Sequence, residues 1–217
     1  MLEADGIEYQ IKGKKILSNI YLKAEKGEVT GIIGRNGCGK TTLMNVIFGS
    51  LKADYASIRI DGQKLKKGIN PEQIQYLPQF TILPDNLSLE RIAKLYNIDF
   101  SEFAQYFKLK VPENARFGEL SKGSQRLLEC YIFLKNPCEV TLLDEPFSFI
   151  MPIYVEKIKQ LINYQKPNKT IIITDHMFRH VNEVCDKLFL IKNGRTIPIK
   201  QQNDLIQNGY LPDNYFD

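Results

Sequence analysis

The sequence has no long hydrophobic run, no closely spaced cysteine pair and no large excess of charge of either sign. Among the 217 residues no stretch approaches the ~18 consecutive apolar residues of a spanning helix, so we expect no membrane span. The net charge of +4, from 29 basic and 25 acidic residues, is too small to indicate nucleic-acid binding by itself. The polar residues 1–6 show no secretory signal, so we expect a cytoplasmic protein.

The four cysteines, Cys38, Cys130, Cys138 and Cys185, form no C-x-x-C pair. This spacing argues against a zinc site and against a thioredoxin-type redox pair. The sequence also has no internal repeat and no low-complexity block. A content of 43% hydrophobic and 25% charged residues is typical of a soluble globular chain, and the length predicts one domain with a small insertion.

Strands and helices alternate at both ends of the chain, whereas the middle is helical. The pattern predicts strands at 7–11, 16–24, 29–33, 57–60, 139–143, 170–174, 187–192 and 195–200. It predicts helices at 41–48, 90–96 with Ser88 as its cap, 101–107, 125–134 and 176–186, one that begins at Pro152, and a short one after 201. We therefore expect a single α/β domain, 1–217, in which 1–79 and 139–200 form the core, 80–138 a helical subdomain and 201–217 a tail.

The strongest motif reads Gly-Arg-Asn-Gly-Cys-Gly-Lys-Thr and lies between a predicted strand and a predicted helix. It matches G-x-x-x-x-G-K-[ST], in which backbone N–H groups and the helix N-terminus cradle phosphate. A chance glycine-rich loop is the alternative, and the strand–helix context argues against it. Lys40 is expected to neutralise the β- and γ-phosphates and Thr41 to bind Mg²⁺. The expected nucleotide-binding residues of this segment are Gly34, Arg35, Asn36, Gly37, Cys38, Gly39, Lys40, Thr41 and Thr42.

Two adjacent acids, Asp144 and Glu145, end the predicted strand at 139–143. Because successive residues of a strand point to opposite faces, the two carboxylates can have different tasks. Asp144 can hold the Mg²⁺ shell, and Glu145 can polarise an attacking water. Surface acids at a strand end are the alternative reading. Beside a phosphate loop, the pair predicts Mg-dependent nucleotide hydrolysis.

A third motif, Leu120-Ser121-Lys122-Gly123-Ser124-Gln125-Arg126, precedes the acidic strand. Taken alone it reads as an ordinary helix cap. In this order along the chain it resembles the nucleotide-binding subunit of ABC transporters, whose signature reads Leu-Ser-Gly-Gly-Gln. The stretch around the acidic pair and Ile-Thr-Asp-His looks most like the subgroup that contains the lipopolysaccharide-export ATPase.

The resemblance implies a P-loop NTPase (RecA-like) core with an N-terminal antiparallel β subdomain and a helical insertion. It implies ATP and Mg²⁺ as cofactors, with Lys40, Gln79, Glu145 and His176 as the catalytic residues. It implies Thr41, Gln79 and Asp144 around the metal. It also implies that Ser121 and Gly123 of one subunit complete the ATP site of a second subunit.

The sequence departs from the family pattern in two places besides Lys122 and Ser124. At the register of the aromatic residue that stacks on adenine stands Ile11, and Tyr9, two residues earlier on the same strand face, is the possible substitute. The family reads Ser-x-Leu-Asp after the acidic strand, whereas this chain ends the same segment with Met151. The resemblance therefore leaves communication between the two sites of a dimer in doubt.

The resemblance implies a subunit that powers an ABC transporter through ATP-driven head-to-tail dimerisation. The expected partners are a separate transmembrane permease and a second ATPase subunit, identical or different, with membrane contact only through the permease on the inner face and no nucleic acid. Two alternatives stay open. One is a soluble ABC-type ATPase that acts on the ribosome or on DNA, and the other is a weakly hydrolysing nucleotide-binding regulator.

Overall fold

The computed structural model describes residues 1–65, 70, 72–112, 114–213 and 215. The remaining residues of the expected core segment 1–79, of the expected helical subdomain and of the expected tail lie outside the described residues. The division of the chain at residues 80 and 138 stays a prediction. Within the described part, no helix combines the length and the apolar character that a membrane crossing requires.

A six-stranded sheet in the order β10-β9-β3-β8-β7-β6 forms the centre of the molecule. Its strands are β3 (Val29–Ile33), β6 (Ile74–Leu77), β7 (Val140–Asp144), β8 (Thr170–Thr174), β9 (Lys187–Lys192) and β10 (Arg195–Ile199). The strands from β9 to β6 are parallel, and β10 pairs antiparallel with β9. Every residue of β3, β6, β7 and β8 is buried. A parallel sheet buried in this way needs cover on both faces, as in α/β proteins.

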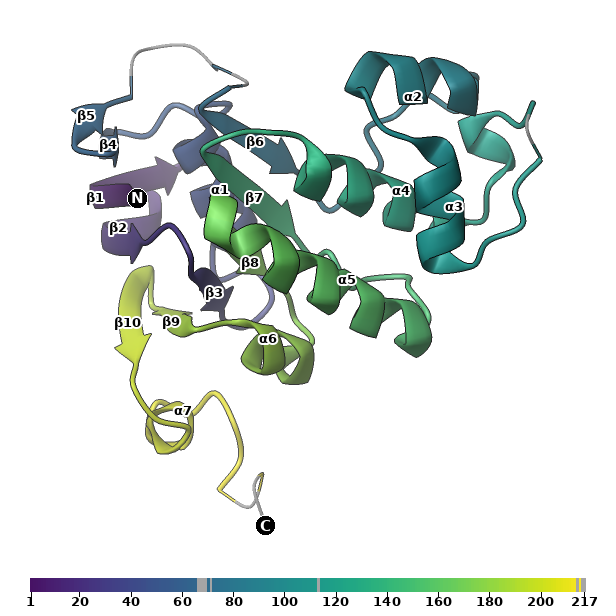
Figure 1. Ribbon diagram of the computed structural model, residues 1–217. Helices are drawn as coiled ribbons and strands as arrows, with labels where there is room; N and C mark the ends of the chain where they lie inside the picture. Colours follow the sequence, from purple (N-terminus) through teal and green to yellow (C-terminus); the bar gives the residue numbers. More distant parts are fainter. Residues whose placement is uncertain (66–69, 71, 113, 214, 216–217) are drawn as a thin grey trace.

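An antiparallel sheet in the order β2-β1-β4-β5 lies beside the central sheet (Figure 1). Its strands are β1 (Leu2–Ile11), β2 (Lys14–Ala24), β4 (Tyr55–Ile60) and β5 (Gln63–Lys64). Buried apolar side chains of β1, β2 and β4 share one cluster with helix α1 (Lys40–Phe48) and with Val140 and Ile172 of the central sheet. This confirms the expected N-terminal antiparallel layer.

The strand β1 begins five residues before the expected position at residue 7. The polar pair Asp5-Gly6 obscured the alternation of apolar residues there. Gly6 has a φ of 63° where the pairing of β1 with β2 and β4 is irregular. A bulge-like residue of this kind lets a strand continue across a break in its pattern.

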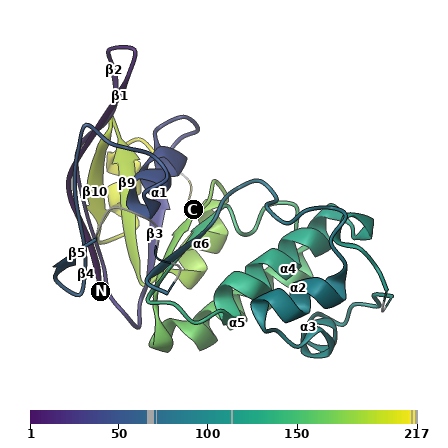
Figure 2. The same cartoon turned by 90° about the horizontal axis from the view of Figure 1, so that it is seen from above.

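Helices cover the other side of the central sheet and extend away from it. They are α2 (Leu89–Tyr96), α3 (Phe100–Phe107), α4 (Lys122–Lys135), α5 (Pro152–Gln165), α6 (Phe178–Val184) and α7 (Asn203–Gln207), with 3-10 helices Phe117–Glu119 and Lys166–Asn168. Figure 2 shows α2 and α3 at the end of the molecule opposite β1, β2, β4 and β5. Cluster contacts join them to α4 and α5, as the helical middle of the sequence predicted.

Capping side chains explain where several helices begin. Ser88 accepts a hydrogen bond from the backbone of Arg91 and begins α2, as expected. Asp99 caps α3 in the same way, so this helix begins at Phe100, one residue before the predicted start. Helix α6 begins two residues later than predicted, because the Asp175 carboxylate accepts from the backbone N–H of Met177 and forms a turn before the helix.

Candidate active site

The phosphate loop connects β3 to α1 at the carboxyl end of the central sheet, where ligands of such sheets bind. Gly34, Gly37 and Gly39 have φ values of 155°, 76° and 109°. A Cβ atom on Gly34 would lie 2.5 Å from Sγ of Cys38, and one on Gly39 would lie 3.0 Å from a methyl carbon of Leu17. The loop conformation therefore depends on glycine at these positions.

Lys40 is the first residue of α1 and is only 7% exposed. Its ammonium group donates to the carbonyl oxygens of Gly34 at 2.8 Å and of Arg35 at 3.5 Å. In the described part of the chain its hydrogen-bond acceptors are thus carbonyls rather than carboxylates. A buried cation that is not neutralised by an acid attracts an anion strongly, and the adjacent helix N-terminus adds to that attraction.

A pocket of about 460 Å³ brings the loop together with segments that lie far apart in the sequence. Its lining contains Ile11, Ile16, Asn36, Gly37, Gly39, Lys40, Thr41, Thr42, Gln79, Glu145 and His176. We call it the phosphate-loop pocket. Most of the predicted catalytic and nucleotide-binding residues lie here, and Ile16 is a lining residue that the sequence analysis missed.

Glu145 is the residue on which the polar contacts of the pocket converge. Its oxygen Oε2 accepts hydrogen bonds from Gln79 Nε2 at 2.8 Å and from Ser148 Oγ at 3.1 Å. The ring nitrogen Nδ1 of His176 lies 3.2 Å from the same oxygen. Glu145 has a φ of 51°, an uncommon conformation for a side chain of this kind and one that is found at functional sites. These contacts hold the carboxylate in one orientation.

Asp144 is almost completely buried and does not belong to the lining of the pocket. Its carboxylate accepts hydrogen bonds from the hydroxyl of Tyr76 at 3.0 Å and from the hydroxyl of Thr174. Burial raises the pKa of the Tyr76 phenol well above its usual range, so the phenol stays a hydrogen-bond donor. Sequence reasoning missed both partners. Tyr76 could have been found from its position three residues before the predicted site residue Gln79.

Several predicted nucleotide-binding residues lie outside the lining of the pocket. Tyr9 is half-buried and packs against the cluster of the antiparallel sheet, whereas Ile11 is 47% exposed and lines the pocket. Arg35 donates a hydrogen bond to the carbonyl of Gly209 at 3.0 Å. Burial raises the pKa of the Cys38 thiol, so this side chain stays neutral in the loop.

The signature residues Ser121 and Gly123 also lie outside this pocket. Ser121 caps α4 by accepting from the backbone N–H of Ser124 at 3.1 Å. A Cβ atom on Gly123 would lie 2.9 Å from the carbonyl oxygen of Phe149, so the signature packs closely against the loop that follows Glu145. That loop and the start of α5 expose large apolar side chains. We call Ser121, Gly123, Phe149, Met151 and Ile153 the signature surface.

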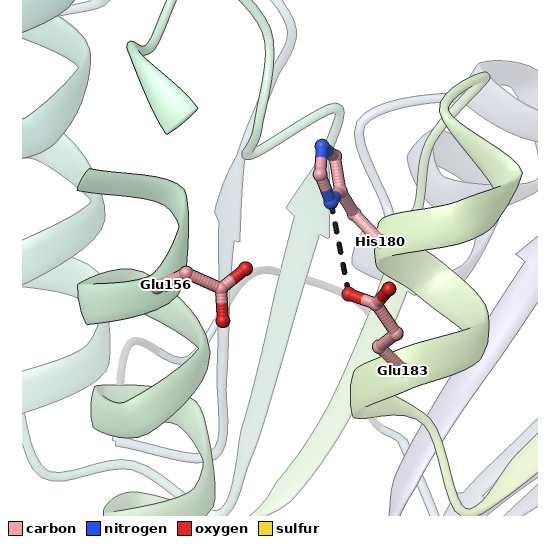
Figure 3. Close-up of side chains that lie close together, drawn as sticks. All are labelled: Glu156, His180 and Glu183. Atoms are coloured by element: carbon pink, nitrogen blue, oxygen red, sulfur yellow. Dashed lines mark ion pairs between the residues drawn. The ribbon is translucent and has the colours of Figure 1, made fainter. Parts of the chain in front are cut away.

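A separate cluster of titratable side chains, Glu156, His180 and Glu183, lies between α5 and α6 (Figure 3). Their ligand atoms lie within 4.8 Å of one another, which is close enough for a shared metal ion. The ammonium group of Lys159, however, lies 2.7 Å from Glu156 and also pairs with Glu183. A metal would have to displace this cation, whose side chain is only 6% exposed. We therefore interpret the cluster as an ion-pair network that joins the two helices.

Comparison with known proteins shows which family this arrangement resembles. The family profile described as ABC transporter matches residues 17–148. The ABC transporter A family member 11 of Dictyostelium discoideum is 30% identical over 93% of this chain, which spans only 27% of that relative. The lipopolysaccharide export system ATP-binding protein LptB of Haemophilus influenzae is 26% identical over 99% of this chain and 98% of its own length.

A solved structure titled as the ATP binding subunit of an ABC transporter has a similar fold. It aligns with a TM-score of 0.82 and 23% identity, and the alignment covers 97% of this chain and 94% of the other. At this identity the likeness shows the fold alone. That fold is the P-loop NTPase fold that the resemblance to ABC transporter subunits implied.

Proposed function

The chain belongs to the ABC transporter family, and from that premise we propose that it is the subunit that binds and hydrolyses Mg-ATP to power a transporter. The observation that carries the proposal is the convergence of Lys40, Gln79, Glu145 and His176 on one pocket. Lys40 and the loop amides can hold the phosphates, while the other three surround the place where a water must attack. A site that only bound ATP would not require Gln79, Glu145 and His176 at this place.

The loop holds the triphosphate through charge and backbone donors. Lys40 exchanges its carbonyl acceptors for phosphate oxygens, which are stronger acceptors because they are ionised. The N-terminus of α1 adds its partial positive charge at the same position. At the end of the pocket expected to hold the adenine ring, Ile11 and Ile16 offer apolar contact. We therefore expect most of the binding energy to come from the phosphates.

The oxygen donors around the pocket fit a magnesium ion, which prefers oxygen ligands and keeps several waters. Thr41 offers its hydroxyl and Gln79 its amide oxygen, because the amide nitrogen of Gln79 already donates to Glu145. Asp144, held by Tyr76 and Thr174, can accept hydrogen bonds from waters of the ion. Bound Mg²⁺ would neutralise charge that develops on the β- and γ-phosphates.

Glu145 is the group that we expect to orient and polarise the attacking water. Gln79, Ser148 and His176 all contact its oxygen Oε2, and we propose that the other oxygen, Oε1, receives the hydrogen bond of the water. His176 is half-exposed and sits at the edge of the pocket, where its ring can reach a γ-phosphate. These residues thus position the Glu145 carboxylate and the γ-phosphate together, so the water and the phosphate lose orientational freedom before the reaction.

A second subunit completes the site in this proposal. Ser121 and Gly123 lie outside the phosphate-loop pocket of their own chain, although hydroxyl and amide donors at a helix N-terminus suit a γ-phosphate. A head-to-tail dimer would bring them to the pocket of the other subunit. Hydrolysis would then remove the shared phosphate and open the dimer.

The permease contact is proposed at an apolar groove beside the segment 78–83, which carries Gln79 and which we call the glutamine loop. The groove is lined by Asn45, Phe48, Ser50, Ile74, Gln75, Tyr76, Pro78, Phe80, Ile82 and Phe133. Phe80 is 72% exposed and directly follows Gln79, so a partner in the groove would touch a neighbour of the catalytic residues. We propose a cytoplasmic subunit at the inner face of the membrane, held there by a separate permease. The names of relatives such as the export-system ATP-binding protein agree with such a division of labour.

One observation favours the weakly hydrolysing regulator as the second candidate. Met151 is the N-cap residue of α5, makes no side-chain capping hydrogen bond and is 58% exposed. It therefore offers no polar link to a second subunit, where the family pattern has an aspartate. A dimer without this link could bind ATP and turn it over slowly.

The test combines phosphate release with affinity purification. The purified chain should release phosphate from ATP only when Mg²⁺ is present. A tagged chain extracted from membranes in detergent should retain a membrane-spanning partner, and Phe80→Asp should release it, with Tyr164→Asp on an exposed part of α5 as the control. Retention of ribosomal proteins instead would support the soluble alternative, and absent turnover with the membrane partner bound would support the regulator.

A further inference from the structure

Arg126 is a buried cation on α4 that touches two catalytic segments at once. Its side chain is only 5% exposed. One terminal nitrogen, Nη1, donates to the carbonyl of Pro78 at 2.7 Å, and the other, Nη2, donates to the carbonyls of Asp144 at 2.5 Å and Glu145 at 3.2 Å. The guanidinium group is planar, so the positions of its donors are fixed relative to one another. The spacing between Pro78 and Glu145 is therefore set by one rigid group.

Glu129, one turn farther along α4, holds the other end of the glutamine loop. Its carboxylate is fully buried and accepts from the backbone N–H groups of Ile82 at 2.8 Å and Leu83 at 3.3 Å. Its second oxygen lies 3.7 Å from Arg126 Nη1, so the two charges also compensate each other. A buried pair of this kind is costly unless its hydrogen bonds are made, and here backbone groups of catalytic segments satisfy Glu129 Oε1 and both terminal nitrogens of Arg126.

The segment from 78 to 83 is thus attached to α4 at both ends. Between the attachment points lies Gln79, whose amide nitrogen donates to Glu145. Arg126 then holds Glu145 from the backbone side, while Gln79 holds it from the carboxylate side. Both interactions determine where the carboxylate stands relative to the phosphate loop.

We infer that Arg126 and Glu129 are positioning residues that keep the glutamine loop and the catalytic carboxylate Glu145 in register with each other. The inference rests on the proposed hydrolysis of ATP at this pocket. Neither residue lines the phosphate-loop pocket. A shift of the 78–83 segment moves Glu145 through the Arg126 guanidinium, so the activity of the pocket depends on where that segment lies.

The kinetic test uses Arg126→Lys, which keeps the positive charge but cannot bridge two segments, because an ammonium group is a point donor. ATP turnover is measured per nucleotide-binding site, with the sites counted by titration of a fluorescent ATP analogue. We expect kcat per site to fall about tenfold, since small misplacements of a catalytic group have large effects. KM should stay within about twofold, because Lys40 and its loop are unchanged.

The matched control is Lys169→Met. Lys169 is also a buried cation that donates to backbone carbonyls, those of Leu134 and Asn136, but at the opposite end of α4. It should lower stability and leave kcat per site unchanged. The double variant Arg126→Lys with Gln79→Ala should be no slower than the slower single variant, because both changes act on the same carboxylate. A multiplied loss in the double variant, or an equal loss in Lys169→Met, would overturn the inference.

Hydrogen exchange tests the same link without any hydrolysis. Arg126→Lys should speed amide exchange in peptides that cover both 78–83 and 144–149, and Glu129→Met should speed it at 82–83. Lys169→Met should change neither peptide. Faster exchange in only one of the two segments in Arg126→Lys would show that Arg126 does not join them. If the wild type releases no phosphate at all, the proposed function fails, and the exchange result still decides the role of Arg126.

Discussion

The phosphate-loop pocket and the signature surface differ in how their side chains are held. In the pocket, Lys40 and Glu145 are nearly buried and are fixed by hydrogen bonds within the chain. On the signature surface, Phe149 is 77% exposed and Met151 is 58% exposed. A pocket organised before the ligand arrives loses little entropy on binding. The exposed side chains of the signature surface gain burial only when another molecule covers them, so we propose chemistry for the pocket and association for this surface.

The largest effect should follow the loss of the loop lysine. Lys40→Ala removes the buried cation that faces the phosphates, and we expect kcat/KM for ATP to fall about a hundredfold or more. Phosphate release and titration of a fluorescent ATP analogue measure turnover and binding. The control is Lys52→Ala, at an exposed position just after α1. A Lys40→Ala variant that binds ATP normally would show that the phosphate-loop pocket is not the ATP site.

A smaller loss should follow removal of one buried hydroxyl behind the pocket. Tyr76→Phe leaves Asp144 without one of its donors, which we expect to lower the free energy of unfolding by about 1 kcal/mol. Turnover should fall about tenfold if Asp144 must be held to act on the metal waters. Denaturant unfolding and phosphate release give the two numbers, and Tyr164→Phe on the exposed part of α5 serves as the control. Unchanged turnover with lowered stability would make Tyr76 a packing residue only.

Contacts with the adenine or guanine ring should have a moderate effect on nucleotide affinity. Because Ile11 offers no ring for stacking, we expect ATP and GTP affinities within about tenfold of each other, or ~1.4 kcal/mol. Ile11→Tyr should tighten both by about 0.5–1.5 kcal/mol through stacking. Competition with the fluorescent analogue measures these affinities. A strong preference for ATP that Tyr9→Ala abolishes would contradict the placement of Tyr9 against the core.

The smallest expected effect concerns communication across the signature surface. Met151 has only a weakly accepting sulfur, so the two sites of a dimer should act with little cooperativity. The Hill coefficient for ATP hydrolysis in the assembled transporter should be near one and should rise in Met151→Asp. A cooperative wild type that the substitution leaves unchanged would show that this loop does not set the coupling.

The sequence predicted the parts of this comparison that rest on local patterns. The phosphate loop, the Ser88 cap and the buried strands β3, β7 and β8 follow from residues that are adjacent in the chain. The strand β6 was missed, because its four residues, Ile74–Leu77, are too few for their apolar and polar side chains to show a clear period.

Contacts between distant segments could not be predicted in this way. The hydrogen bond from Tyr76 to Asp144 and the bridge that Arg126 makes from Pro78 to Glu145 depend on how strands and α4 pack in space. No regular spacing in the sequence distinguishes these residues from ordinary core residues. The order of motifs placed Gln79 and His176 beside Glu145 only through the resemblance to a family.

The central claim is that ATP in the phosphate-loop pocket closes a dimer against the signature surface. Glu145→Gln tests it most directly, because the change removes the base and preserves the shape of the side chain. In size-exclusion chromatography with saturating Mg-ATP, this variant should shift from one subunit to two. The shift should disappear when Lys40→Ala is added or Mg²⁺ is removed. A variant that stays monomeric with ATP bound, and that still hydrolyses ATP at the wild-type rate, would contradict the account.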